Sequence, residues 1–84
     1  MIKQVYAVRD GKACIYHAPF TVLNEAVAVR MVHNAVNADD QGELSFNASD
    51  FDLYHLGEFD DESGKLDVFE APKHVVHCAH LKDE

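Results

Sequence analysis

The stretch from residue 24 to residue 37 restricts the fold most, because its apolar residues recur with the period of an α-helix. At about 100° per residue, one side of this helix collects Ala28, Val29, Met31, Val32, Ala35 and Val36. Asn24 is a favourable N-cap, and Glu25 suits the positive end of a helix dipole. The pattern predicts one amphipathic helix that buries Val29, Val32 and Val36 against a sheet.

The residues before this helix have the pattern of a β-hairpin. Residues 2–9 are rich in β-branched and aromatic side chains, and Asp10-Gly11 is typical of a type I′ turn. Residues 12–18 are expected to form the second strand, which places Cys14 in mid-strand as a packed thiol. A two-residue turn would pair Tyr6 with Ile15. Pro19 would end the hairpin.

A second pair of strands is expected after the helix. Residues 38–49 are polar and favour a loop, whereas residues 50–59 alternate between apolar and polar side chains, as a strand does. Gly57 lies inside this strand, where glycine marks a bulge or a close backbone approach. Residues 60–64 form a polar turn, a fourth strand holds Leu66 to Phe69, and Pro72 is expected to stop the sheet.

The chain has 84 residues, which suits a single domain. We expect an α+β fold of order β-β-α-β-β, with one amphipathic helix packed on an antiparallel sheet. The domain would span residues 1–72, and residues 73–84 would form a C-terminal tail or a short helix.

The charge of the chain is unevenly distributed. The formal net charge is −8, and residues 39–70 carry eleven acidic side chains against Lys65 alone. Residues 1–38 carry four basic and two acidic side chains, so a nucleic-acid contact would have to use this half. No apolar run approaches the length of a membrane span, and two distant cysteines favour a reducing cytoplasm.

Two groups of motifs in this sequence resemble those of a known family. In the first half they are Val5-Tyr6-Ala7-Val8-Arg9-Asp10, Pro19-Phe20, Asn24-Glu25-Ala26 with Ala28 and Arg30, and Asn34-Ala35-Val36-Asn37. In the second half they are Asp52-Leu53-Tyr54, Leu56-Gly57-Glu58-Phe59-Asp60, Gly64-Lys65 and Ala71-Pro72. These motifs resemble the small nonstructural protein of the gokushovirus-type microviruses, which are single-stranded DNA phages, and the resemblance covers residues 1–72. It implies a role in phage genome replication, at the switch from duplex replication to single-stranded progeny synthesis in the host cytoplasm.

The residues suggest no catalytic centre and no cofactor. Asp60, Asp61 and Glu62 are expected in an exposed turn without a pocket, which does not suit acid–base catalysis. His74, His77 and Cys78 are weak candidates for metal ligands, because they would share one side of a helix. The zinc-finger spacing is absent, so a polar tail is the favoured interpretation. We therefore expect a protein that is not an enzyme.

Two functions remain open. An acidic surface could bind a basic host or phage replication protein. Alternatively, the first hairpin could bind single-stranded DNA through aromatic and basic side chains, namely Lys3, Tyr6, Arg9, Lys12, Tyr16 and Phe20. The competing interpretation places the aromatic rings of this group in the core. The small core and the apolar faces of the hairpin also predict a homo-oligomer, most simply a homodimer.

Overall fold

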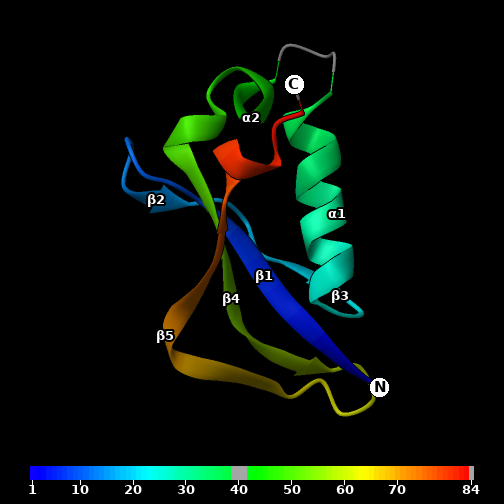
Figure 1. Cartoon of the computed structure of the whole chain (residues 1–84). Helices are drawn as coiled ribbons and strands as arrows, with labels where there is room; N and C mark the ends of the chain where they lie inside the picture. The colour runs from blue at the N-terminus through cyan, green and yellow to red at the C-terminus, as the bar shows by residue number, and fades with distance from the viewer. Residues whose placement is uncertain (39–41, 84) are drawn as a thin grey trace.

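The computed structural model describes residues 1–38 and 42–83. Within that part of the chain, five strands form one curled antiparallel sheet, and one main helix packs on it (Figure 1). The strands are β1 (Ile2–Asp10), β2 (Ile15–Tyr16), β3 (Phe20–Val22), β4 (Phe51–Asp60) and β5 (Leu66–His77), and the main helix is α1 (Glu25–Val36). A short helix α2 (Glu43–Phe46) and two 3₁₀ helices, η1 (Ala48–Asp50) and η2 (Cys78–Leu81), complete the fold. The predicted α+β class, with a helix on an antiparallel sheet, is confirmed.

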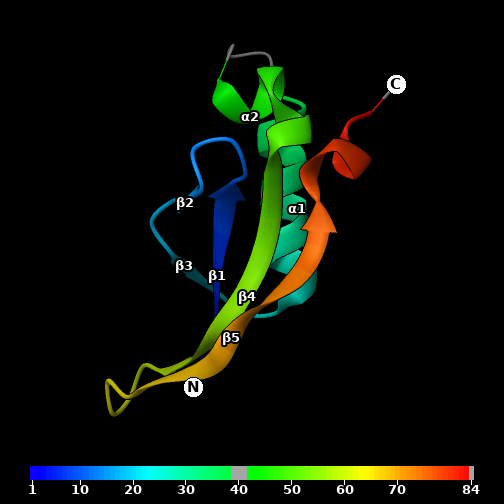
Figure 2. The same cartoon turned by 90° about the vertical axis from the view of Figure 1, so that its left-hand side faces the viewer.

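The sheet has the order β2-β1-β4-β5, and β3 pairs with the same strand, β1, as β2 does. Figure 2 shows β4 and β5 curving away together from α1, with the start of β1 still beside them. The β4–β5 register shifts near Gly57, where an added Cβ would lie only 2.4 Å from the carbonyl oxygen of Asp67. Glycine is therefore required there, as its position inside the strand predicted.

The first turn is longer than its sequence predicted, and the predicted pairing of Tyr6 with Ile15 is wrong. Asp10 pairs with Ile15, so residues 11–14 form the turn. The Asp10 carboxylate accepts hydrogen bonds from the backbone N–H groups of Lys12 and Ala13, at 3.0 and 3.1 Å. Such Asx turns compete with a tight hairpin turn. Cys14 is exposed in this turn, with φ of 58°, and is not the packed mid-strand thiol that we expected.

A third strand follows Pro19, where the sequence predicted only the end of a hairpin. β3 places Phe20 opposite Tyr6 on β1. The predicted loop 38–49 is also partly helical, since it contains α2 and the start of η1, although residues 39–41 lie outside the described residues.

The helix begins as predicted. The Asn24 side chain accepts a hydrogen bond from the backbone N–H of Val27 at 3.0 Å, which caps α1. The buried side of the helix presents Ala28, Val32 and Val36, whereas Met31 is 48% exposed. These side chains pack against Tyr6, Val8, Phe51, Leu53 and Cys78 in one core. None of the helices in the described residues is long and apolar enough to cross a membrane.

The prediction that Pro72 stops the sheet is wrong, because β5 continues through it to His77. The strand lies at one end of the sheet order, and an edge strand tolerates proline, whose missing N–H would otherwise leave a gap in the ladder. After β5, the chain forms η2, which buries Cys78. The side chain of Asn37 then fastens this segment to α1, since its amide donates to the carbonyl oxygens of His33 and Leu81 at 2.9 and 2.8 Å.

Candidate functional surfaces

The two faces of the sheet separate the six residues predicted to contact DNA. Tyr6 is only 1% exposed and lies in the core under α1. Its ring stacks on His55 at 4.5 Å and on Phe20 at 6.4 Å between ring centroids. Burial raises the pKa of the Tyr6 hydroxyl. Tyr6 is therefore a core residue, and Phe20, which packs against the same core, is only partly accessible.

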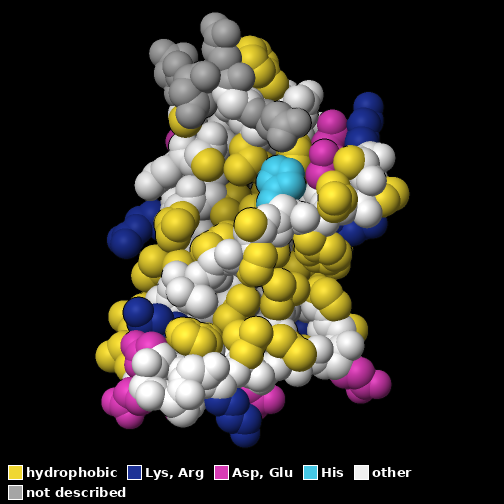
Figure 3. Space-filling model, turned by 180° about the vertical axis from the view of Figure 1, so that it is seen from behind, with side chains coloured by type: hydrophobic (Ala, Val, Ile, Leu, Met, Phe, Trp, Pro, Cys, Tyr) yellow, Lys and Arg dark blue, Asp and Glu magenta, His cyan; other side chains and the backbone are white. Residues whose placement is uncertain are grey.

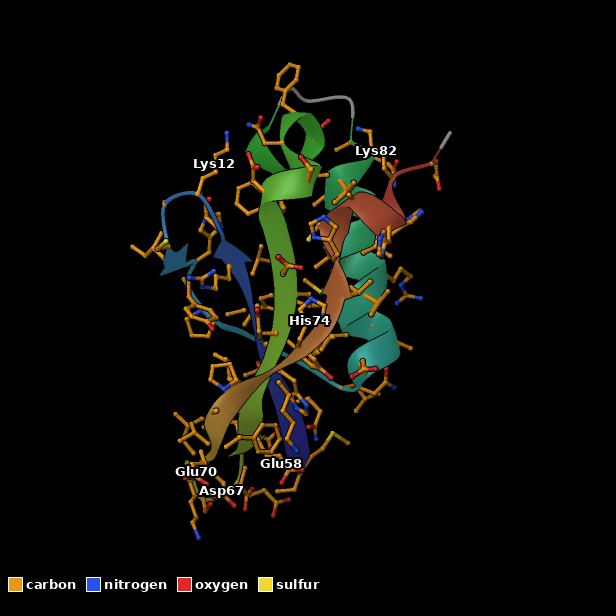
Figure 4. All side chains as sticks on the ribbon, turned by 60° about the vertical axis from the view of Figure 1, so that its left-hand side comes forward. Lys12, Glu58, Asp67, Glu70, His74 and Lys82 are labelled. Carbon is orange, nitrogen blue, oxygen red and sulfur yellow. The ribbon has the colours of Figure 1, made fainter. Side chains whose placement is uncertain are left out.

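The four remaining candidates do not form one group. The Lys3 ammonium lies 3.7 Å from the Asp61 carboxylate near the β4–β5 turn. Lys12 lies at the opposite end of the sheet, in the β1–β2 turn (Figure 4). Only Arg9 and Tyr16 are direct cross-strand partners, with the Arg9 guanidinium carbon 5.8 Å from the centre of the Tyr16 ring.

Arg9 and Tyr16 belong to a larger outer face, on the side of the sheet opposite α1. Direct partners on antiparallel strands point to the same side. The register therefore places six side chains together in two rows: Tyr16, Arg9, Asp52 and His77 in one, and Tyr54 and His74 in the next. The Tyr16 and Tyr54 rings meet edge to face at 5.6 Å, and those of Tyr54 and His74 at 5.3 Å. We call these six side chains the outer-face cluster.

Sequence reasoning missed Tyr54 and His74 as members of this cluster. A local signal existed for Tyr54. It alternates with Phe51 and Leu53, which are buried, so a position facing away from the core was deducible. No comparable signal existed for His74, because it depends on β5 continuing past Pro72 and on the shifted β4–β5 register.

A carboxylate joins the two histidines of the cluster. One oxygen of Asp52 lies 2.9 Å from the His74 Nε2 atom and 2.9 Å from the His77 Nδ1 atom. Burial pushes the pKa of Asp52 upward, but the hydrogen bonds from His74 and His77 outweigh it and hold this pKa below its usual value. The Asp52 side chain therefore stays ionised and ties β4 to β5.

The three weak candidates for metal ligands do not have the same surroundings. His74 and His77 both point to Asp52, whereas Cys78 is fully buried in the core. Burial, reinforced by the charge of Asp52, raises the pKa of the Cys78 thiol to about 11, so this thiol is not a ready ligand or nucleophile. Among residues 1–38 and 42–83, no group of three or more His, Cys, Asp or Glu side chains is arranged to hold a metal ion.

A second surface lies on the part of the β4–β5 hairpin that extends beyond the core, residues 57–70, which we call the arm. Its acidic side chains are Glu58, Asp60, Asp61, Glu62, Asp67 and Glu70. Figure 4 shows Glu58, Asp67 and Glu70 together at one end of the molecule, far from Lys12. Leu66 and Val68 lie among these acids and are 58% and 62% exposed. A hollow on the arm is lined by Ile2, Glu58, Asp60, Lys65 and Asp67.

Two aspartates at the tip of the arm are held in their ionised form. Backbone N–H groups of the turn, first that of Glu62, donate to Asp60 and lower its pKa. The ammonium group of Met1 lies 2.7 Å from the Asp61 carboxylate and lowers the pKa of Asp61. Asp60 and Asp61 therefore stay ionised to a lower pH than ordinary aspartates do.

The fold and these surfaces define a small α+β protein with a curled antiparallel sheet and one main helix. The chain matches the family model described as "Phage ORF5 protein" over residues 3–81, and it belongs to this family of phage proteins. The match includes the last part of β5 and η2, beyond the stretch that carried the resemblance noted in the sequence. Comparison with curated proteins and with solved structures finds no match.

Proposed function

We propose that this phage protein is a non-enzymatic nonstructural protein that acts in viral genome replication by binding a host or phage replication protein through the arm. The observation that carries the proposal is the pair of exposed apolar side chains, Leu66 and Val68, on an arm that carries six acidic side chains. Exposed apolar groups surrounded by polar ones mark protein interaction sites. The resemblance to the gokushovirus-type protein supports the further proposal that the target controls the switch to single-stranded progeny DNA in the host cytoplasm.

Charge indicates the chemistry of the partner. The arm concentrates acidic side chains, so a partner with a basic surface would be attracted over several ångströms and oriented before contact. Leu66 and Val68 would then supply apolar contact, which gives affinity that salt does not remove. The hollow beside Glu58 and Asp67 could accept a lysine or arginine side chain of the partner.

Phage carrying Val68→Asp tests the proposal, and Val68→Ile is the matched conservative variant. Val68 is exposed, so both proteins should fold. We expect Val68→Asp to change the ratio of single-stranded to duplex viral DNA in infected cells, and Val68→Ile to leave it at the wild-type value. The double variant Asp67→Asn/Glu70→Gln should weaken capture of the replication complex more at low salt than at high salt. A wild-type DNA ratio in Val68→Asp phage with normal protein levels would contradict the proposal.

Direct binding of single-stranded DNA is the second candidate. The outer-face cluster favours it, because Tyr16, Tyr54 and Arg9 could stack and hold bases, each stack contributing about 1–3 kcal/mol. The charge of Asp52 in the same row and the net charge of −8 oppose it. We expect weak or no binding of an oligonucleotide at physiological salt by fluorescence anisotropy. Submicromolar binding that Tyr16→Ala or Tyr54→Ala abolishes would make DNA binding the better proposal.

A further inference from the structure

The edge of the sheet formed by β2 and β3 differs from the rest of the surface because it lacks charge. Charged residues make up 26% of the chain, yet residues 13–24 include no Asp, Glu, Lys or Arg. Residues 11–19 are all exposed. The exposed apolar side chains of this β2–β3 face are Ala13, Ile15, Ala18, Pro19 and Leu23.

The hydrophobic part of this face lies on one side of the molecule, and its length can be compared with that of a protein interface. Figure 2 places β2 and β3 together on one side of the molecule, and Figure 3 looks at that side, with hydrophobic side chains over its middle and charged ones mostly at its margins. Ile15 is 58% exposed and Leu23 is 57% exposed. The two ends of the face lie opposite Asp10 and Gln4 of β1, which are roughly 20 Å apart at the rise of a strand. A standard interface buries about 800 Å² per partner, which corresponds to a square patch with a side of roughly 28 Å, so the face spans most of that width in one direction.

The charge of the chain indicates which kind of partner can bind this face. Two copies that each carry −8 repel one another, and the repulsion between their arms acts within about 8 Å at physiological ionic strength. A second copy can therefore approach most readily through residues 13–24, which carry no acid. The cross-strand neighbour Asp10 has its carboxylate engaged by the backbone N–H groups of Lys12 and Ala13. A basic partner, in contrast, would gain nothing from this neutral face and is matched by the arm.

We propose that a second copy of the chain packs against the β2–β3 face and forms a twofold dimer. Twofold contact buries the same apolar side chains on both copies and leaves the two arms outside the interface. Burying Ile15 and Leu23 would also add apolar contact to a domain with a small core. The proposal does not depend on the partner of the arm or on the role in replication.

Sedimentation of Ile15→Asp beside Leu66→Asp tests the location of the interface. The two side chains are equally exposed, at 58%, so the variants differ in position rather than in burial. We expect wild type and Leu66→Asp to be dimers at tens of micromolar protein, and Ile15→Asp to be a folded monomer with a dissociation constant at least tenfold weaker. Ala18→Glu should act like Ile15→Asp. A monomeric wild-type protein, or dissociation by Leu66→Asp and not by Ile15→Asp, would overturn the proposal.

The natural cysteines allow a direct check of proximity. Cys14 is exposed beside Ile15, and Cys78 is buried. A short bismaleimide should therefore link two copies through Cys14, and the control Cys14→Ser should give no linked dimer. Cys14→Ser/Ser63→Cys moves the exposed thiol to the tip of the arm and should also stay unlinked. Efficient linkage through position 63 and none through Cys14 would place the interface elsewhere and overturn the proposal.

Discussion

The two halves of the β4–β5 hairpin have opposite physical character, although the same two strands form both. In the half near η2, Phe51 and Leu53 are fully buried in the core. In the arm, Leu66 and Val68 are more than half exposed. The molecule is accordingly elongated, with extents of 41 × 23 × 18 Å. Within one hairpin, the first half contributes side chains to the core and the second leaves apolar and acidic side chains on the surface.

Helix length explains where this change occurs. α1 has 12 residues and is therefore roughly 18 Å long at the rise of a helix. β4 has 10 residues and reaches roughly 33 Å at the rise of a strand, so α1 covers only part of it. The sequence changes at the same place, because the strand continues after Gly57 with Glu58 and Asp60 rather than with large apolar pairs like Phe51 and Leu53. Solvent-exposed acids in the arm follow from this mismatch in length.

The largest expected difference between the two regions is in the free energy of unfolding when a valine is replaced by aspartate in each of them. Val32→Asp puts an unpaired charge under α1, where Val32 is 3% exposed. A buried charge costs several kcal/mol, and a domain of this size has about 5 kcal/mol of stability, so the variant should unfold. Val68→Asp in the arm should change the free energy of unfolding by only about 0.5 kcal/mol, as exposed substitutions do.

Thermal melts followed by circular dichroism compare these two variants directly. Val32→Ala serves as a milder control in the core and should lower the melting temperature without abolishing the fold. If Val32→Asp melted at the wild-type temperature, the helix would not be the element that covers the core. If Val68→Asp unfolded the protein, the arm would contribute to stability and the contrast between the halves would fail.

A smaller effect is expected where the C-terminal segment closes the core. Asn37 donates to the carbonyl oxygens of His33 and Leu81, and its own oxygen accepts from the backbone N–H of Asp83 at 2.7 Å. Asn37→Ala removes all three hydrogen bonds and should cost about 1–3 kcal/mol. The measurement is the rate at which a maleimide labels Cys78, which is buried beneath η2.

The expected result is faster labelling of Cys78 in Asn37→Ala, with the sheet otherwise intact. Asn34→Ala is the matched control, because Asn34 is exposed on the same helix. Labelling in this control should match wild type. Equal labelling of Cys78 in wild type and Asn37→Ala would show that packing of η2, rather than Asn37, closes this end.

The elements that could be predicted from the sequence are those with local signals, and the features that could not are those that depend on tertiary contacts. The helix, its Asn24 cap and strand β4 were predictable because their signals are local and periodic. The β1–β2 turn was not, because Asp10 forms side-chain hydrogen bonds that the Asp-Gly motif does not specify. The continuation of β5 through Pro72 depends on that strand lying at the edge of the sheet, which is a tertiary property.

Of the candidate surfaces, the acidic arm could be predicted from the sequence and the outer-face cluster could not. The acidic character of the arm follows from composition, because its six acids all lie within residues 58–70. The outer-face cluster could not be predicted as a whole, since Arg9, Tyr54 and His74 come from three strands whose register is set by bulges. Tyr6 and Tyr16 were grouped as DNA-binding candidates because both are aromatic, although strand alternation with the predicted two-residue turn already puts them on opposite faces. The longer turn of the structure keeps them there.

The smallest expected effect concerns Asp52, which ties β4 to β5 between the core and the arm. Its pKa is lowered in the folded protein, whereas the unfolded chain has a value of about 3.9. The ionised Asp52 therefore stabilises the fold above about pH 4, and this contribution is lost as the pH falls through the lower folded pKa.

Because the pairs with His74 and His77 are partly exposed, the contribution should be only about 0.5 kcal/mol. Denaturant unfolding of wild type and Asp52→Asn should thus differ at neutral pH and converge once the pH has fallen below the lowered pKa of Asp52. His33→Gln is the control with the opposite sign: its hydrogen bond to Asp83 raises the pKa of His33, so any stabilisation is present below about pH 6.5 and is lost as the pH rises. A difference between wild type and Asp52→Asn that stays constant from pH 7 to pH 2 would show that Asp52 acts through packing rather than through its charge.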